Sequence, residues 1–342
     1  MSIELLLGTY TRRKSEGVYQ VELNTEEKKL ENLSLLAKVG SPTYLAKNDK
    51  ENIIYSIVNE DGHGGVLSLV QNEDGNYVRQ STLVSEGPSP AYIAFDNQRN
   101  FIYTSNYHKG EVAVYSSDHS GNLKKLDTIT HSGSSVHENQ KSPHVHYSNL
   151  TPDGKYLAVC DLGTDEVYTY EIDDQGQLSE KARLKVKKGS GPRHLTFHPS
   201  GKIAYLFAEL SSEIIVLDYH SDRGEFSERQ TLSTIPESHT EFNGGAAVRL
   251  TKDGQFLYAS NRGHDSIAIF KTDDQGELSL VDYQPTEGNT PRDFNLDPSE
   301  RFLIVGHQDS DNLTLFERNQ ENGQLKLLQK DFFAPEVVNI HL

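Results

Sequence analysis

The sequence is internally repetitive, and this repetition constrains the fold more than any other feature. Six copies align when each begins at a Pro, or at a residue in its place, nine residues before a turn. The copies begin at Pro42, Pro90, Val145, Pro192, Gly245 and Pro291. Four of the turns each carry two or three of Pro, Asp and Gly, the residues that tight turns prefer, and these are Thr151–Gly154, His198–Gly201, Thr251–Gly254 and Asp297–Glu300.

Each copy holds four segments with the pattern of β-strands. After the first turn come two β-rich stretches separated by a short polar loop, such as Phe256–Ser260 and Ser266–Phe270 around Asn261–Asp265. A second turn, for example Asp273–Gly276, precedes the last stretch. The segments alternate with period two and no helical period is sustained. Four-stranded units repeating at roughly 44 to 55 residues predict propeller blades, because one small sheet cannot bury both of its faces alone.

The two ends of the chain complete a seventh unit. Pro335–Ile340 has the pattern of a first strand, whereas Ile3–Thr9, Gly17–Leu23 and Leu30–Ala37 have the pattern of the three strands that follow. Pairing the termini closes the ring and removes an open sheet edge. The sequence therefore predicts one all-β domain over residues 1–342. We expect a seven-bladed β-propeller with four antiparallel strands per blade, closed by about residues 1–39 and 334–342.

Composition excludes several partners. The chain carries 33 basic and 50 acidic residues, a net charge of −17 that disfavours nucleic acid and anionic membrane. The one cysteine, Cys160, permits no intramolecular disulfide and fits a reducing compartment. The apolar run Leu5–Leu7 is too short for a signal peptide, and no run is long enough for a membrane helix. These features predict a cytoplasmic protein.

Cationic and amide side chains gather in the loops that a propeller brings to one mouth of its channel. There, the loop entering each innermost strand shares a face with the loop between the second and third strands. The entering loops supply His144, His146, Arg193, His194, Arg292 and Asp293. The other loops supply Arg12, Arg13, Asn59, Glu60, His63, Asn106, His108, Asp161, Asp165, Glu209, Asn261, Arg262, His264, His307 and Asp309. On an acidic protein this set predicts a small anionic ligand.

Three features of these loops have competing interpretations. His144 and His146 are spaced like metal ligands but lack a third ligand at a recognisable distance, so hydrogen-bonded histidines are favoured and no metal or other cofactor is predicted. Glu209 lies among apolar residues, which indicates a partly buried carboxyl with a raised pKa; an ion pair with an arginine is the alternative. The long connection 131–142 is either a functional loop or a surface insertion.

Six motifs together resemble a known family. They are Leu7–Thr11, Ser142–His146, Asp161–Asp165, Gly189–His194, Ala208–Leu210 and Ser260–His264. Over the whole chain the sequence is similar to the seven-bladed lactonase family, which includes propeller-type bacterial 6-phosphogluconolactonase and fungal carboxy-muconate lactonizing enzyme. The resemblance implies a catalytic group made of His146, Arg193, Glu209 and Arg262. It also implies a small anionic lactone, most simply 6-phosphogluconolactone, as the substrate.

Lactone hydrolysis needs a base, an oxyanion partner and an acid for the departing ring oxygen. We expect Glu209 or His146 as the base, Arg193 beside the oxyanion, and Arg262 with His194 on the anionic group. The remaining expected substrate-binding residues are His144, Asp161, Asn261 and His264. The alternatives are a muconate-type cycloisomerase, in which the arginines would hold carboxylates, and a non-catalytic propeller that binds a ligand.

Overall fold

The computed structural model describes residues 2–342, and all of its regular structure is β. These residues form 28 strands in seven four-stranded antiparallel sheets and no helix. Consequently, no described helix could span a membrane. Met1, which belongs to the predicted closing blade, lies outside the described residues. The chain divides into two compact units, Met1–Lys38 with His194–Leu217 and Arg229–Leu342, and Val39–Arg193 with Asp218–Glu228.

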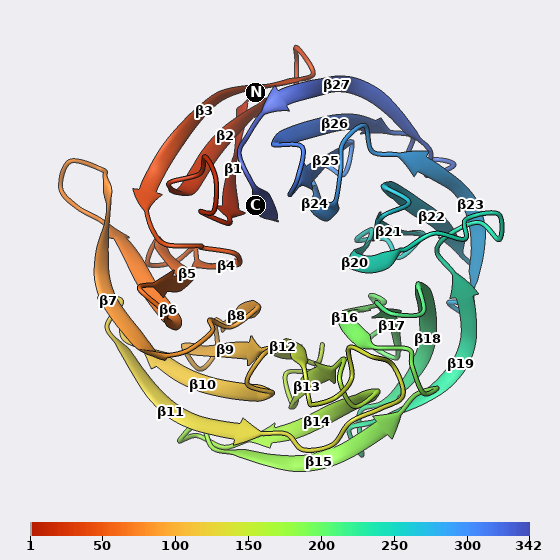
Figure 1. The fold of residues 1–342 in the computed structure, drawn as a ribbon, viewed down its shortest axis with the longest axis horizontal. Helices are drawn as coiled ribbons and strands as arrows, with labels where there is room; N and C mark the ends of the chain where they lie inside the picture. Colours follow the sequence, from red (N-terminus) through yellow and green to blue (C-terminus); the bar gives the residue numbers. More distant parts are fainter. Residues whose placement is uncertain (1) are drawn as a thin grey trace. The chain divides into compact units, whose positions relative to one another are not determined.

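The first unit contains three complete sheets (Figure 1). One has the order β28–β1–β2–β3, with β1 Ser2–Thr9, β2 Gly17–Asn24, β3 Lys29–Lys38 and β28 Val337–His341. The next runs β20 Gly244–Leu250, β21 Phe256–Arg262, β22 Ser266–Thr272 and β23 Leu278–Pro285. The last runs β24 Pro291–Leu296, β25 Phe302–His307, β26 Asn312–Arg318 and β27 Leu325–Phe333.

The second unit also contains three complete sheets. They comprise β4 Leu45–Asn48, β5 Ile53–Glu60, β6 His63–Gln71 and β7 Tyr77–Glu86; β8 Tyr92–Asp96, β9 Phe101–Asn106, β10 Glu111–Ser117 and β11 Leu123–Thr130; and β12 Val145–Leu150, β13 Tyr156–Asp161, β14 Glu166–Ile172 and β15 Leu178–Lys185. The seventh sheet, whose residues fall in both units, consists of β16 Pro192–Phe197, β17 Ile203–Ala208, β18 Glu213–His220 and β19 Glu225–Ser233.

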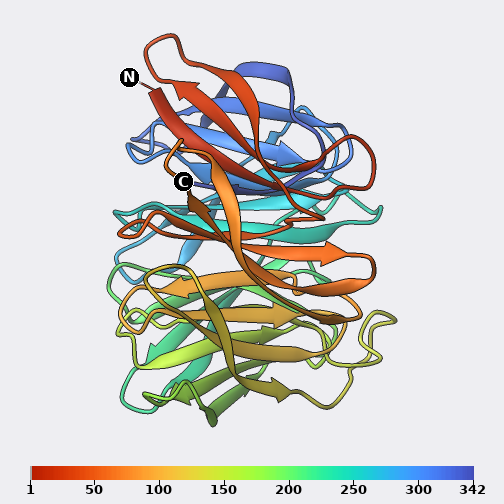
Figure 2. The same ribbon diagram turned by 90° about the vertical axis from the view of Figure 1, so that its left-hand side faces the viewer.

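The chain ends meet in one sheet, as the sequence predicts. β28 pairs antiparallel with β1, so that Leu7 faces Ile340 and Thr9 faces Val337. The same C-terminal strand is held to the neighbouring sheet, because the Asp293 carboxylate accepts hydrogen bonds from the Asn339 amide at 2.8 Å and the Ile340 N–H at 2.9 Å. Figure 2 shows the red strands of this sheet beside blue strands from the C-terminal part of the chain, consistent with the packing of β3 on β27.

Burial is greatest in the second strand of several sheets and least in the outermost strands. The second strands are the most apolar, and every residue of β9, β13, β17 and β25 is buried. The outermost strands β7, β15 and β19 alternate between exposed and partly buried residues, since only one of their faces packs on the protein. Apolar clusters lie between neighbouring sheets, for example where Phe256 and Tyr258 of β21 meet Phe294 of β24. The loops that follow the second strands are therefore anchored on buried strand ends.

Candidate active site

An ion pair joins two of the predicted catalytic residues. Glu209 directly follows β17 and Arg262 is the last residue of β21, two strands that are both second in their sheets. Glu209 Oε1 lies 2.9 Å from Arg262 Nη2, and the side chains are 19% and 15% exposed. The structure therefore supports the ion-pair interpretation of Glu209. An arginine at this distance stabilises the ionised carboxylate.

The Arg262 guanidinium is fixed by further hydrogen bonds. Nη2 donates to the Gly245 carbonyl at 2.8 Å and Nε donates to the Gly244 carbonyl at 3.4 Å. Both acceptors belong to β20, the strand that pairs with β21. A side chain at 244 would crowd this arrangement, because a Cβ there would lie 3.1 Å from Arg262 Nη2. The same Cβ would lie 3.5 Å from the ring of Phe242. Phe242 is 78% exposed and lies near the Arg262 side chain.

Asn261 supports the Arg262 turn from within the protein. Its side chain is fully buried, and its amide oxygen accepts hydrogen bonds from the Thr234 hydroxyl at 2.7 Å and from Asn243 Nδ2 at 3.1 Å. Its Nδ2 donates to the Thr234 carbonyl at 2.8 Å. These bonds tie the turn to the loop that leads into β20. The structure thus gives Asn261 partners inside the protein.

His264, two residues after Arg262, lies in a cluster of aromatic rings. Its Nδ1 is 2.6 Å from the Ser266 hydroxyl, and its ring meets that of His239 edge-on at 4.9 Å. Burial and the neighbouring His239 lower the pKa of His264. A lowered pKa keeps the imidazole neutral at neutral pH, so His264 can offer a hydrogen bond to a ligand but no positive charge.

In the second unit, both residues of the predicted His pair lie against one tyrosine. The His144 ring stacks on Tyr107 at 4.1 Å with an interplanar angle of 7°, and its Nδ1 is 2.8 Å from the Tyr107 carbonyl. His146 meets the edge of the same ring at 5.9 Å and is 5% exposed. No group of three or more potential metal ligands occurs among residues 2–342. Tyr107 thus contacts both histidines, stacked on His144 and edge-on to His146.

Asp161 holds the backbone that carries the His pair. Its carboxylate, fully buried, accepts hydrogen bonds from the His144 N–H at 2.8 Å and the Gly163 N–H at 2.9 Å. The other oxygen lies 2.7 Å from Nδ1 of His131, whose Nε2 lies 2.9 Å from the Tyr170 hydroxyl. Both carboxylate oxygens are thus engaged inside the protein. The geometry gives Asp161 a positioning role.

Asp165 organises the long loop 131–142 and the loop that leads to Arg193. One of its oxygens accepts hydrogen bonds from Gln140 Nε2 at 2.7 Å and the Gly191 N–H at 2.8 Å. The other accepts from Ser135 and from the Gly189 N–H, the latter at 2.7 Å. The long connection is therefore an anchored loop. Arg193 and His194 follow the second of these loops, at the start of β16, where they are 2% and 4% exposed.

Sequence reasoning missed several residues of these networks. Tyr107, His131, Gln140 and Phe242 lie outside the six motifs, and only their tertiary contacts reveal them. His131 and Gln140 belong to the long connection that the sequence singled out by its length. The aromatic character of Tyr107 and Phe242 beside the mouth loops was the available signal.

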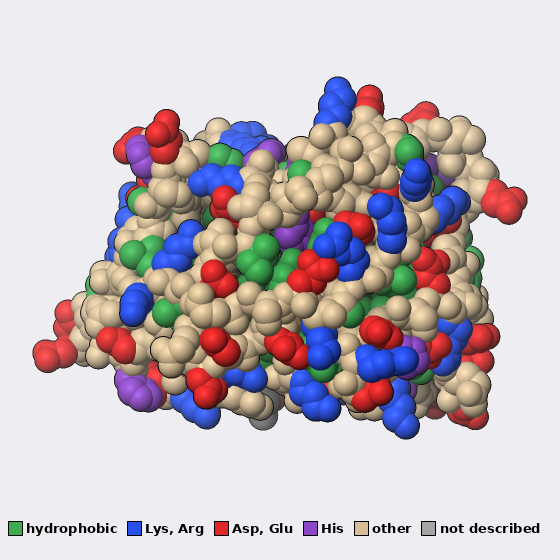
Figure 3. All heavy atoms as spheres, turned by 90° about the horizontal axis from the view of Figure 1, so that it is seen from below, with side chains coloured by type: hydrophobic (Ala, Val, Ile, Leu, Met, Phe, Trp, Pro, Cys, Tyr) green, Lys and Arg blue, Asp and Glu red, His purple; other side chains and the backbone are tan. Residues whose placement is uncertain are grey.

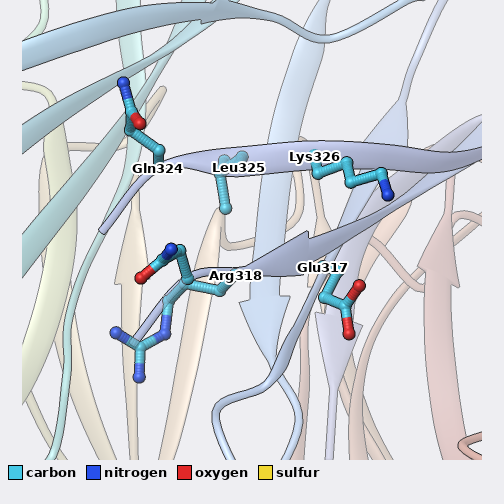
Figure 4. Close-up of a pocket in the computed structure, with 6 residues that line it drawn as sticks. Glu317, Arg318, Gln324, Leu325 and Lys326 are labelled. Atoms are coloured by element: carbon cyan, nitrogen blue, oxygen red, sulfur yellow. The ribbon is translucent and has the colours of Figure 1, made fainter. Parts of the chain in front are cut away.

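A pocket lies elsewhere on the first unit. It has a volume of about 430 Å³ and is formed by the hairpin of β26 and β27, where Glu317, Arg318, Leu325 and Lys326 line it (Figure 4). Figure 4 shows the Glu317 and Lys326 side chains on the two strands and the Arg318 side chain at the turn end. None of the predicted catalytic residues lines this pocket.

A model of the family described as "Lactonase, 7-bladed beta-propeller" matches residues 4–342. The chain belongs to this lactonase family. The predicted architecture of seven blades with four antiparallel strands each is therefore confirmed, as is the closing blade built from both termini. The match covers essentially the entire chain, which is a lactone-hydrolysing enzyme of this family.

Relatives cover the full length of the lactonase. A 6-phosphogluconolactonase of Bacillus subtilis is 43% identical over 332 residues, which is 96% of this chain and 95% of that protein. A crystal structure from Lactobacillus plantarum superposes with a TM-score of 0.97 at 44% identity, covering 100% and 99% of the two chains. The periplasmic gluconolactonase PpgL of Pseudomonas aeruginosa gives a TM-score of 0.92 at 30% identity, covering 100% and 99%.

Proposed function

We propose that this lactonase hydrolyses 6-phosphogluconolactone to 6-phosphogluconate in the cytoplasm. The Bacillus subtilis relative that carries this name is 43% identical along nearly the whole chain. The single observation in the structure that carries the proposal is the ion pair of Glu209 with Arg262, which places a carboxylate beside a cation at a partly exposed position. Cys160 is fully buried, and burial raises the pKa of its thiol, so this thiol is not a competing nucleophile.

In the proposed reaction, water adds to the lactone carbonyl carbon. Glu209 takes a proton from the attacking water, since a carboxylate ionised by an adjacent arginine is a proton acceptor that retains access to solvent. The bond between the carbonyl carbon and the ring oxygen then breaks. The ring oxygen gains a proton and becomes a hydroxyl, and the carbonyl carbon becomes a carboxylic acid that ionises.

We assign the other two steps to residues that the family resemblance singles out. Arg193 stabilises the negative charge that develops on the carbonyl oxygen, for which a guanidinium offers two parallel donors. His146 gives the proton to the departing ring oxygen, a role that suits an imidazole because its ring nitrogens can both carry and donate a proton. Asp161 and Asn261 position these loops from below and do not touch the substrate in this proposal, because both are fully buried.

The test is hydrolysis of freshly generated 6-phosphogluconolactone, measured as rate above the spontaneous reaction with and without chelator. We expect acceleration that survives the chelator and falls by at least about 10²-fold in Glu209→Gln and in Arg193→Ala, the usual effect of losing one acid–base or oxyanion group. Retention of near-normal turnover in both variants contradicts the residue assignment. Absence of acceleration by the wild type contradicts the substrate and directs attention to a muconate-type dicarboxylate.

A further inference from the structure

Arginines of this acidic protein are commonly matched by carboxylates. Arg79 pairs with Glu60 at 2.7 Å, Arg183 with Glu180 at 2.8 Å and Arg249 with Asp293 at 2.9 Å. On the face drawn in Figure 3, blue basic side chains lie interspersed with red acidic ones. Within residues 2–342, Arg12 and Arg292 are exceptions, because the guanidinium of neither forms an ion pair.

Both exceptions lie over one aromatic ring. The Arg12 guanidinium carbon is 3.8 Å from the centroid of the Tyr10 ring, and that of Arg292 is 5.7 Å from the same centroid. A tyrosine face attracts one cation, but two cations that share a ring repel each other. An anion bound between them would remove this repulsion and satisfy guanidinium donors that have no carboxylate.

The residues next to Arg12 show that it is not simply part of a charged run. Arg13 lies 2.7 Å from Asp311, and Lys14 lies 3.4 Å from the same carboxylate group. Arg292 donates through Nη1 to the neutral amide oxygen of Gln308 at 3.0 Å. Of three consecutive cations, therefore, only the first lacks an acidic partner.

The loop that carries Arg12 is held in place by a buried carboxylate. Glu336 is fully buried and accepts hydrogen bonds from the backbone N–H groups of residues 12, 13, 14 and 15 at 2.8 to 3.1 Å. Four such bonds fix the loop before any ligand arrives. A preorganised cation loses little entropy on binding an anion.

The sheet register places Tyr10 and Arg292 at strand ends that correspond, in their own sheets, to the end of β21 that carries Arg262. Tyr10 follows the end of β1, where Thr9 faces Val337, and Arg292 is the second residue of β24, next to Pro291, which faces His307. Arg262 stands at the equivalent end of β21, opposite Gly244. β24 packs against both β20 and β28, so the sheets that carry these residues are neighbours within the first unit.

Arg262, to which the sequence reasoning assigned the anionic group, already serves Glu209 and two carbonyl oxygens. We propose instead that Arg12 and Arg292, on their shared Tyr10 ring, form the subsite that binds the phosphate monoester of the lactone substrate. A guanidinium fork matches two phosphate oxygens, and two forks suit a dianion. This subsite rests on the proposed lactonase function and deepens it.

The test measures binding without turnover. Titration calorimetry compares 6-phosphogluconate with gluconate, which share a carboxylate and differ in the phosphate, on wild type, Arg12→Gln, Arg292→Gln and the matched control Arg13→Gln. We expect the wild type to bind 6-phosphogluconate at least about 10-fold more tightly, and each subsite variant to lose about 10-fold of that affinity. Affinity for gluconate stays unchanged throughout, and Arg13→Gln behaves as wild type. Thermal melts confirm that all variants are folded.

Equal affinity of the wild type for both acids, or equal losses in Arg13→Gln, overturns the subsite. A matching loss of gluconate affinity in the Arg12 and Arg292 variants also overturns it, because the effect is then not specific to phosphate. Turnover of both lactones by the same proteins separates this result from the proposed function. A phosphate preference that depends on the two arginines, without turnover of either lactone, supports the subsite and contradicts the lactonase proposal.

Discussion

Two segments of the molecule, Asp161–Asp165 at the end of β13 and Asn261–Asp265 at the end of β21, are built alike but have different roles. Each begins with a fully buried polar side chain, Asp161 or Asn261, that is hydrogen-bonded to a loop. Each ends with an aspartate at positive φ, 59° for Asp165 and 49° for Asp265. Between them stands a glycine so close to an incoming carbonyl that a Cβ at 163 would lie 2.0 Å from Ser142 O and one at 263 would lie 2.1 Å from Phe242 O.

The difference lies in the second residue of each turn. Leu162 is fully buried and packs in the protein, whereas Arg262 extends to Glu209. The backbone of the repeat thus determines where the turn lies, and one side chain decides whether it packs or takes part in chemistry. A third turn repeats this arrangement with a different buried residue. His307 ends β25 in the equivalent buried position, four residues before Asp311 at φ 54°.

The largest expected effect comes from giving one turn the residue of the other. Arg262→Leu should lower kcat/KM for the lactone by at least about 10²-fold, because Glu209 loses the cation that keeps it ionised. The acidic limb of the pH–rate profile should also move to higher pH. Steady-state kinetics across pH measures both, with Arg183→Leu on an outer strand as the control. Activity within about threefold of wild type would mean that this position is structural in both turns.

A smaller effect is expected from the two aspartates at positive φ. Asp165 uses both oxygens for four donors, whereas the hydrogen bonds of Asp265 from Gly263 and Thr290 go to Oδ1 alone. Asp165→Asn should therefore cost roughly 3 kcal/mol of unfolding free energy, since an amide nitrogen then faces donors. Asp265→Asn keeps its acceptor and should cost less than about 1 kcal/mol. Urea unfolding compares them, and equal losses would show that the turns are anchored equivalently.

In the third turn, His307 occupies the buried position and makes the stability of the protein depend on pH. Burial lowers the pKa of His307 from 6.5 to about 4, so the unfolded chain binds the proton more readily between these values. The contribution of neutral His307 is complete above pH 6.5 and is lost as the pH falls through 4. Over this window we expect the unfolding free energy to fall by roughly 3 kcal/mol from this group. Urea titrations of wild type and His307→Gln measure it, and parallel pH dependences would refute the assignment.

The smallest effect is expected at the loop residues that pack on the two glycines. Ser142 and Phe242 occupy equivalent places, and the Phe242 ring is 78% exposed beside the Glu209–Arg262 pair. Phe242→Ser should raise KM for the lactone a few-fold, by about 1 kcal/mol of lost ring contact, with kcat and stability nearly unchanged. Phe333→Ser, at another exposed phenylalanine, is the matched control. A loss of kcat without a change in KM would indicate that the ring orients Arg262.

The positions of two candidate site residues could be predicted from the sequence, because they lie at the same place in two copies of the repeat. Placing Arg262 and Glu209 at the ends of equivalent second strands required only counting along the repeats, and the two are in contact in the structure. The roles of Asp161 and Asn261 did not follow, because a polar residue in a mouth loop has the same pattern whether it faces solvent or turns inward. Their complete burial depends on Thr234 and His131, which lie 27 and 30 residues away in the chain.

The sequence by itself determined the strand pattern, the number of blades and the pairing of the chain ends. Turn residues and alternating apolar positions act locally, and they recur in every copy. Only the tertiary structure decided which arginines form ion pairs with carboxylates. Arg12 and Arg13 are adjacent and identical in type, yet Arg13 meets Asp311 and Arg12 meets Tyr10. That choice is made by Glu336, more than 300 residues away, whose buried carboxylate fixes the loop, and no local pattern encodes it.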